Sequence, residues 1–426
     1  MTQRTPAPAD PGRVAPAEPE HLRGAPTPDP SPAPPRSAPE PQAPSPGPGL
    51  AAARSELAPE PQAPTPGLAP EPQAPTPGHA PEPRTVPTLN GHPRDDLHRA
   101  IAALRADHHP DELPELVARA TWTGLAEPGD GAAGLLVETL GAEPALRLLL
   151  DRATAAQLVA EVQRHGVAPA PGLEQLLGQG LERWSAKLDS RLMLRALRNA
   201  ASLGLRLLAP GDADWPEGLD DLGVHGPLAL WSKGRPERLA ALGRSIALVG
   251  ARAATTYGEQ VAMEAAAGLV DRGFAVLSGA AYGIDGMAHR SALASEGVTV
   301  AVLAGGLDRY YPSGHEQLLR RIAEEGAVVS ELPPGAAPTK WRFLQRNRLI
   351  AAMSQATIVL EAGRRSGSLN TAGHASALAR PLGAVPGPVT SPASAGCHRL
   401  LREYDAVCVT TAEEMAELAP PEPAPA

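Results

Sequence analysis

Seven short apolar runs between residues 245 and 410 constrain the fold of this chain more than any other feature. They read SIALVG, FAVLSG, VTVAVLAGG, AVVSE, ATIVLEA, LGAVPG and AVCVT, and amphipathic helical segments separate most of them. Continuous apolar strands that alternate with helices are typical of a parallel sheet covered on both faces. We therefore predict an α/β fold, a Rossmann-like doubly wound and mainly parallel sheet, over residues 245–412.

The segments on either side of this sheet have other patterns. Residues 96–204 repeat apolar side chains at spacings of three and four, with Gly and Pro between the repeats, which predicts a small helical domain. Residues 205–244 are rich in turn-forming residues, and we interpret them as an extended connecting segment. For residues 413–426 we predict a disordered C-terminal tail, and we expect no winged-helix domain.

Residues 1–95 are rich in Pro and Ala, and APEPQAPTPG occurs there twice. So few branched and aromatic side chains cannot offset the entropy of ordering, which predicts a disordered tail. The N-terminus lacks the apolar stretch of a secretory signal, so we expect a cytoplasmic protein without a membrane partner. Cys397 and Cys408, the two cysteines, provide neither a disulfide framework nor metal-ligand spacing, so we expect no metal site. We also expect no cofactor.

In a doubly wound sheet the ligand binds beyond the carboxyl ends of the strands. The loops there include VGARAATTYG, SGAAYGIDGMAH, SELPPGAAPTKWRFLQRNR and EAGRRSGSLNTAGHA. Gly beside small hydroxyl or basic residues allows the backbone N–H groups of a loop to approach a phosphate closely. The first loop lacks G-x-G-x-x-G, and G-x-x-x-x-G-K-[ST] is absent from the chain, so dinucleotide binding and P-loop ATP hydrolysis have no support.

A polynucleotide ligand fits the distribution of charge better. Residues 245–414 carry 15 Lys and Arg against 15 Asp and Glu, so the net charge of -9 arises outside the sheet domain. The segment KWRFLQRNR, residues 340–348, contains four cations together with Trp341 and Phe343. Aromatic side chains beside cations are typical of single-stranded nucleic-acid binding. Trp341 is equally compatible with a place in the core.

We expect a helix that begins near Gln345 and buries Leu349, Ile350 and Met353. Arg346 and Arg348 would then lie in the first turn, where the helix dipole disfavours cations. They are two residues apart and point in different directions. We therefore expect one to face phosphate and the other to pair with an acid such as Asp285 or Glu361.

Taken in order, these loops resemble the DNA-processing protein A family (DprA, also called Smf), bacterial single-stranded-DNA binders that load RecA recombinase. The chain matches the family's V-G-S-R-x-x-x-x-Y-G loop, S-G-x-A-x-G-I-D-x-x-A-H, G-x-D-x-x-Y-P, F-P-x-R-N-R-I-I-A and E-A-x-x-x-S-G-S-L-x-T-A between Val249 and Ala372. Among the departures from the family's usual residues, Ala251, Tyr282 and Leu344 replace Ser, Arg and Pro.

The resemblance implies a nucleic-acid site and a set of residues that order its loops. The implied nucleic-acid contacts are Arg252, Ser278, Gly279, Gly283, Lys340, Phe343, Arg346, Asn347, Arg348, Gly367 and Ser368. The implied loop-ordering residues are Gly250, Asp285, His289 and Glu361. For Asp285 and His289 a structural role is favoured, since an Asp in a first helical turn often satisfies backbone amides.

The resemblance also implies partners and a function. The implied partners are single-stranded DNA, RecA recombinase and a second copy of the chain, which forms a homodimer through the Rossmann-like domain. The implied function is protection of incoming DNA and RecA loading in natural transformation and recombination, without enzyme activity. The alternative is a nucleotide-processing enzyme of the lysine-decarboxylase-like phosphoribohydrolase type, although its P-G-G-x-G-T-x-x-E loop has no counterpart here.

Overall fold

The computed structural model describes residues 94–105 and 109–419. The tail predicted at residues 1–95 lies outside the described residues, except that Arg94 and Asp95 begin the first helix. Residues 420–426, the end of the second predicted tail, lie outside them as well.

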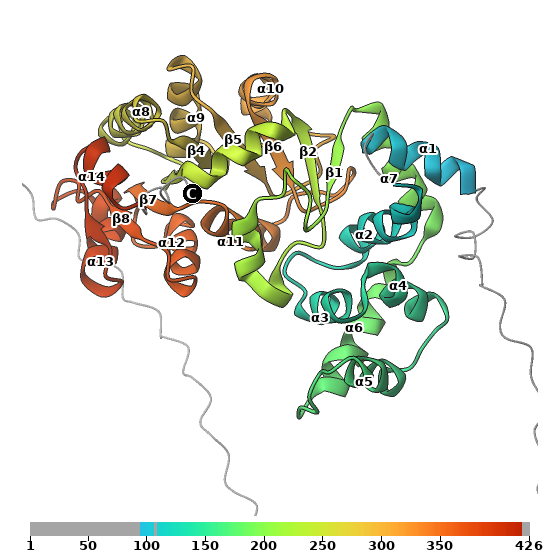
Figure 1. The fold of residues 1–426 in the computed structure, drawn as a ribbon. Coiled ribbons are helices and arrows are strands. Elements are labelled where there is room, and N and C mark those ends of the chain that lie inside the picture. Colours follow the sequence, from blue (N-terminus) through green and yellow to red (C-terminus); the bar gives the residue numbers. More distant parts are fainter. Residues whose placement is uncertain (1–93, 106–108, 420–426) are drawn as a thin grey trace, which may run out of the picture. The chain divides into compact units, whose positions relative to one another are not determined.

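All seven predicted strands form. They are β3 (Ser245–Gly250), β4 (Ala275–Ser278), β5 (Thr299–Leu303), β6 (Ala327–Ser330), β7 (Ala356–Glu361), β8 (Leu382–Ala384) and β9 (Val407–Cys408). They pair in parallel in the order β6-β5-β4-β3-β7-β8-β9 (Figure 1). The predicted α/β class and doubly wound, mainly parallel sheet are confirmed.

Alternate side chains of the strands enter separate cores. In β3, Ile246 and Leu248 pack in a cluster with α8 (Thr256–Asp271) and α9 (Ile284–Ala294). Ala247 and Val249 belong to the opposite cluster, which includes side chains of α11 (Lys340–Ala352), α12 (Ser368–Ala377) and α13 (Ala395–Glu403). Since helices cover both faces, the residues of β4 to β8 are all buried, which explains the unbroken apolar runs (Figure 1). Val407 and Cys408 of β9, at the edge of the sheet, are exposed.

The segment at residues 205–244, predicted only to connect two domains, extends the sheet. It forms β1 (Arg206–Leu208) and β2 (Leu230–Gly234), which pair antiparallel with each other, and β2 pairs antiparallel with β6. The sheet of the described residues therefore has nine strands. Two short helical segments, η3 (Glu217–His225) and η4 (Pro236–Arg244), complete the region. The strands are short and Gly and Pro surround them, so their apolar pattern is weak.

Residues 94–202 are helical apart from the undescribed gap at 106–108 and short turns. The elements are α1 (Arg94–Leu104), η2 (Pro110–Glu112), α2 (Leu113–Leu125), α3 (Gly131–Leu140), α4 (Ala142–Leu150), α5 (Ala155–Arg164), α6 (Leu173–Lys187) and α7 (Ser190–Ser202). Trp122 and Trp184 meet edge to face at 5.1 Å in one core of this region.

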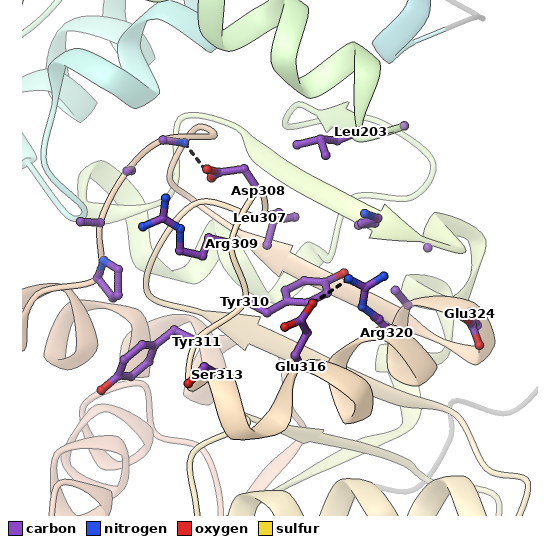
Figure 2. A pocket seen from close by; sticks show the side chains of 18 residues that line it. Leu203, Leu307, Asp308, Arg309, Tyr310, Tyr311, Ser313, Glu316, Arg320 and Glu324 are labelled. Atoms are coloured by element: carbon purple, nitrogen blue, oxygen red, sulfur yellow. Dashed lines mark hydrogen bonds and ion pairs between the residues drawn. The ribbon is translucent and has the colours of Figure 1, made fainter.

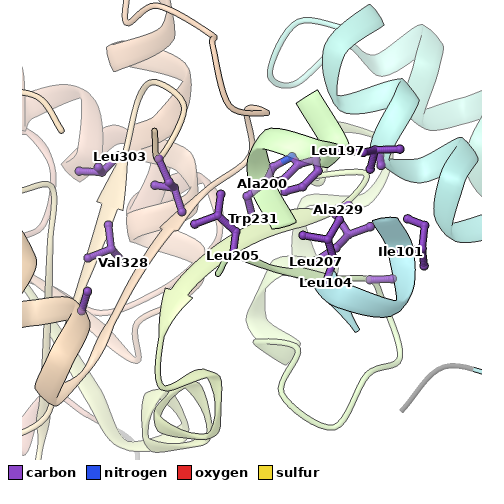
Figure 3. Packing of buried hydrophobic residues seen from close by; sticks show 14 of the residues in the cluster. Ile101, Leu104, Leu197, Ala200, Leu205, Leu207, Ala229, Trp231, Leu303 and Val328 are labelled. Atoms are coloured by element: carbon purple, nitrogen blue, oxygen red, sulfur yellow. The ribbon is translucent and has the colours of Figure 1, made fainter. Parts of the chain in front are cut away.

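A second core joins the helical region to the sheet. Ile101 of α1 and Leu197 of α7 pack around Trp231 of β2 and reach Leu303 and Val328 (Figure 3). Trp231 is fully buried, and its Nε1 donates a hydrogen bond of 3.1 Å to the Thr123 hydroxyl. The helical region and the sheet therefore share one continuous apolar core.

The C-terminal tail was predicted to begin at residue 413, but residues 413–417 are ordered in α14 (Ala412–Glu417). Thr411 caps this helix in a capping box with Glu414, and Met415 is buried in the α8 and α9 core. The remaining short elements are α10 (Glu316–Glu325), η5 (Ser313–His315) and η6 (Pro392–Ser394). None of the helices in the described ranges has the length and apolarity to cross a bilayer.

Candidate nucleic-acid interface

A cleft of about 530 Å³ opens at the carboxyl ends of β3 and β7. The chain runs from β3 outward to β4, β5 and β6, and then returns to place β7 on the other side of β3. This reversal is the topological switch point, where adjacent loops diverge and leave room for a ligand. The position agrees with the crevice predicted from the strand pattern.

The lining of the cleft carries an excess of positive charge. Its titratable side chains are Arg252, Asp285, Arg346 and Arg365. Six of the predicted nucleic-acid contacts line the cleft, namely Arg252, Phe343, Arg346, Asn347, Gly367 and Ser368. Arg252 and Arg365 are exposed, and no ion pair of either side chain is found within residues 94–105 and 109–419. An anionic ligand in the cleft would meet both guanidinium groups.

Phe343 lies at the centre of an aromatic and cationic group. The guanidinium carbon of Arg252 lies 5.0 Å from the centre of its ring, and that of Arg346 lies 5.9 Å from it. The Tyr311 ring lies 5.5 Å away at a tilt of 55°. The separations are those of cation–π and tilted aromatic contacts. Phe343 is partly buried and Tyr311 is 49% exposed, so part of the group faces solvent.

Helix α11 begins at Lys340, five residues before the predicted start at Gln345. Thr339 is the N-cap, and its side chain accepts a hydrogen bond from the Arg342 backbone N–H at 3.2 Å. Lys340 therefore lies in the first turn, where it is exposed, but it does not line the cleft. It precedes Phe343 by three residues, so the two side chains lie on neighbouring parts of the helix surface.

The prediction for the two arginines of α11 is corrected in two respects. Arg346 and Arg348 lie in the second and third turns, not in the first, and both are buried. Arg348 forms its ion pair with Glu331, with Nη–Oε distances of 2.7 and 2.8 Å, and also donates to the His225 carbonyl. Neither of the two acids named from the sequence is its partner. Arg348 therefore has no free donor directed into the cleft.

Arg346 forms the floor of the cleft. Its Nη1 donates to the carbonyl oxygens of Gly279 and Val302, and its Nε donates to the Asn347 side chain. Burial lowers the pKa of Arg346 to about 10, so the guanidinium stays charged at neutral pH. The Asp285 carboxylate beside it favours the charged form. Arg346 thus supplies fixed positive charge from beneath the site.

Asp285 and His289 lie on α9 and are buried, and of the two only Asp285 lines the cleft. Burial raises the pKa of the Asp285 carboxyl, whereas Arg346 and the backbone N–H groups of Ala281 and Gly250 oppose this shift. Burial lowers the pKa of His289 to about 3, so its ring is neutral. The ring Nδ1 lies 2.7 Å from the Thr299 hydroxyl, which donates to the Val276 carbonyl. Nδ1 therefore donates the proton in this contact.

Three predicted contacts lie behind the wall of the cleft. Ser278 is fully buried, and its hydroxyl donates to the Leu248 carbonyl at 2.6 Å. Gly279 is also buried, and a Cβ there would lie 2.3 Å from an Arg346 nitrogen. Gly283 has φ +74°, and a Cβ there would lie 2.6 Å from the Arg252 carbonyl oxygen. These residues let the loop after β4 and helix α11 pack against the loop after β3.

Glu361 and the β7 loop order the other side of the cleft. The Glu361 carboxylate accepts hydrogen bonds from the Thr255 backbone N–H at 2.9 Å and from its hydroxyl at 2.6 Å. Gly250 lets Ile284 approach, since a Cβ at Gly250 would lie 2.5 Å from the Ile284 side chain. These contacts fix the loop that carries Arg252.

Asn347 connects α11 to α12. Its Nδ2 donates to the Asn370 side chain at 3.1 Å and to the Gly367 carbonyl at 3.4 Å. Gly367 is exposed at the N-terminus of α12, whereas Ser368 is buried and its hydroxyl lies 2.7 Å from that of Ser366. The two helices are therefore held at the spacing that defines the cleft.

Tyr311 and Arg365 are not among the contacts predicted from the sequence, although Arg365 lies in the crevice loop EAGRRSGSLNTAGHA. Tyr311 belongs to the G-x-D-x-x-Y-P motif, so its place in a matched loop was the available signal. Two departures from the family pattern, Ala251 and Leu344, line the cleft. A further departure, Tyr282, is 47% exposed, and its hydroxyl accepts a hydrogen bond from the Gly314 backbone N–H at 3.3 Å.

A larger cavity of about 780 Å³ lies on the far side of Tyr311, and Figure 2 shows it. Its charges balance, because Lys233, Arg309 and Arg320 face Asp308, Glu316 and Glu324. Glu316 and Arg320 pair with each other at 2.6 Å. Without excess positive charge, this cavity is less suited to a phosphate backbone than the smaller cleft.

No group of three or more His, Cys, Asp and Glu side chains in the described ranges is arranged to hold a metal ion.

Comparison with known proteins gives the relatives of the chain. The family described as DNA recombination-mediator protein A matches residues 206–420. A Mycobacterium tuberculosis protein that carries the name DNA processing protein DprA is 55% identical over 225 residues, which cover 50% of this chain and 57% of that protein. DNA processing protein DprA of Bacillus subtilis is 37% identical over 194 residues, which cover 46% of this chain and 65% of that protein.

A solved structure resembles the chain over a longer range. The crystal structure of DNA processing protein A from Streptococcus pneumoniae has a TM-score of 0.55 and 26% identity, and the match covers 72% of this chain and 99% of that one. The chain spans less than two thirds of the length of the two sequence relatives. The family match covers the strands and every predicted site residue, and the chain belongs to the DNA recombination-mediator protein A family, also known as DprA or Smf.

Proposed function

We propose that the chain binds single-stranded DNA in the cleft at the carboxyl ends of β3 and β7. The observation that carries this proposal is the contact between Arg252 and Phe343, with the exposed cations Lys340 and Arg365 nearby. In the proposed complex Phe343 stacks on a base, while Arg252, Arg365 and Lys340 contact phosphates. Unpaired bases are required, because the face of a paired base is covered by its neighbours in a duplex.

The cleft favours a binding protein over an enzyme. Its acidic side chain, Asp285, is buried and lies beside Arg346, so no pair of free carboxylates is available for acid–base chemistry. The loop at residues 363–368 offers guanidinium and hydroxyl groups but no carboxylate. Membership of the family supports the same reading, since its name describes a recombination mediator.

We further propose that the bound strand is passed to RecA recombinase, and that two copies of the chain associate through the Rossmann-like domain. These proposals rest on the family resemblance and place the protein in homologous recombination and natural transformation. Sedimentation of the purified chain tests dimer formation. The delay before RecA hydrolyses ATP on single-stranded DNA coated with a single-strand-binding protein tests loading, and we expect the chain to shorten it.

The test of DNA binding is fluorescence polarisation of labelled oligo-dT and of a matched duplex over a series of salt concentrations. We expect the single strand to bind more tightly and its affinity to fall steeply with salt. Arg252→Glu combined with Lys340→Glu should abolish measurable binding. Arg321→Glu on α10, an exposed cation that pairs with Glu325, is the matched control and should bind as the wild type does.

Equal affinity for duplex and single strand, or full affinity in the double variant, would contradict the proposal. Hydrolysis of a nucleoside monophosphate without retention of DNA would favour the nucleotide-processing alternative instead.

A further inference from the structure

Trp341 is the one tryptophan of the chain that faces solvent. It is 56% exposed, whereas the other four of the five tryptophans are at most 6% exposed. Those four are Trp122, Trp184, Trp215 and Trp231. Trp341 follows the exposed cation Lys340, and an exposed aromatic ring beside a cation is typical of single-strand binding. Trp341 does not line the cleft described above.

The start of α11 determines where the Trp341 ring points. Successive residues of a helix are rotated by about 100°, so Phe343 lies roughly 60° to one side of Lys340 and Trp341 about 100° to the other. Lys340 therefore lies between the two aromatic side chains on the surface of the first turn. Arg342 points away from this surface, because its guanidinium donates to both Glu127 oxygens, at 2.9 and 3.0 Å.

We propose that Trp341 is a second stacking residue for single-stranded DNA, next to the base held by Phe343 and separated from it by a phosphate on Lys340. The proposal rests on the proposed function and lengthens the path of the strand from the cleft across the N-terminus of α11. A strand that alternates bases and phosphates matches the order aromatic, cation, aromatic around this turn. The pattern requires no particular base, because every base offers a face for stacking.

The test uses the intrinsic fluorescence of the protein. Acrylamide quenches exposed tryptophan, so in the wild-type chain it should act mainly on Trp341. Saturating oligo-dT should quench the emission of Trp341. The Trp341 emission that remains should be protected from quenching by acrylamide. Both changes should follow the same titration curve as the polarisation of labelled oligo-dT. In Trp341→Phe, DNA should leave the emission of the four buried tryptophans unchanged.

Affinity measured by polarisation gives the second readout. Trp341→Ala should weaken oligo-dT binding about tenfold, which is within the range for loss of one stacked base. Trp341→Phe should restore most of the affinity, because it retains an aromatic face. Tyr404→Ala removes another exposed ring, which stacks with Arg399 at 5.4 Å on α13, and should leave affinity unchanged.

The outcomes separate the two proposals. Absence of polarisation change in the wild type would contradict DNA binding itself. Normal binding with unquenched, unprotected tryptophan and full affinity in Trp341→Ala would overturn the role of Trp341 alone. The emission could instead change with protein concentration in the absence of DNA, while Trp341→Ala keeps full DNA affinity. That result would overturn the DNA-stacking role of Trp341 in favour of a contact between protein molecules.

Discussion

The guanidinium carbon of Arg252 lies 5.0 Å from the centre of the Phe343 ring, although the two residues are 91 positions apart in the sequence. One comes from the loop after β3 and the other from the first turn of α11. The contact couples the residue that we assign to a phosphate with the residue that we assign to a base. Each therefore helps to position the other before DNA arrives.

Coupling predicts that the effects of Arg252 and Phe343 on DNA affinity are not additive. Arg252→Gln and Phe343→Leu should each weaken oligo-dT binding by about 1–3 kcal/mol. The double variant should lose less than the sum, with a coupling energy of at least about 0.5 kcal/mol. Polarisation titrations of the wild type, both single variants and the double variant complete the cycle. Strict additivity would contradict a shared contribution.

The number of phosphate contacts can be counted by salt dependence. For single strands, the slope of log K against log salt changes by about 0.7 for each phosphate neutralised. Arg252→Gln, Lys340→Gln and Arg365→Gln should each make the slope shallower by roughly that amount. Arg321→Gln on α10 serves as the control, and its slope should equal the wild-type value. A variant whose affinity falls while its slope stays unchanged is not a phosphate contact.

Arg348 should matter for stability rather than for DNA binding. Arg348→Met leaves Glu331 buried without its cation and should lower the free energy of unfolding by about 3–5 kcal/mol. Arg348→Met combined with Glu331→Leu should regain most of the loss. Urea denaturation gives the stabilities, and polarisation under native conditions should show wild-type DNA affinity for the double variant. A large loss of affinity in the stable double variant would show that Arg348 contacts DNA.

His289 should contribute to the pH dependence of stability. Burial lowers its pKa from 6.5 to about 3, so between these values the unfolded chain binds the proton and the folded chain does not. The stability that the neutral His289 ring contributes to the free energy of unfolding is therefore fully present above pH 6.5. It is lost as the pH falls towards 3. His289→Asn should have a shallower decline in unfolding free energy over this range, by up to about 1.4 kcal/mol per pH unit. Parallel curves for the variant and the wild type would contradict a buried neutral imidazole.

The strands and the cleft could be predicted because local sequence determines them. A strand covered on both faces must be apolar throughout, so SIALVG and ATIVLEA indicate strands without any knowledge of their neighbours. The ligand crevice was predicted beyond the carboxyl ends of the strands, which is where doubly wound sheets bind ligands. Family motifs then named Arg252 and Phe343, whose contact the structure describes.

Features that depend on distant partners could not be predicted. The pairing of β2 with β6 joins segments about 100 residues apart, and the strand itself contains Ser, Lys and Gly. Arg348 finds Glu331 across the fold, which no spacing rule specifies. The start of α11 was misplaced because Lys340 and Arg342 interrupt the apolar period, although Thr339 was available as a capping signal.

The most direct test of the central claim is a crystal structure of the chain with oligo-dT bound. We expect one base stacked against Phe343, with its flanking phosphates within hydrogen-bonding distance of Arg252 and Lys340. Arg346 and Arg348 should keep the protein contacts described above. A strand that lies in the cavity of Figure 2, or elsewhere on the surface with the Arg252–Phe343 cleft empty, would contradict the account.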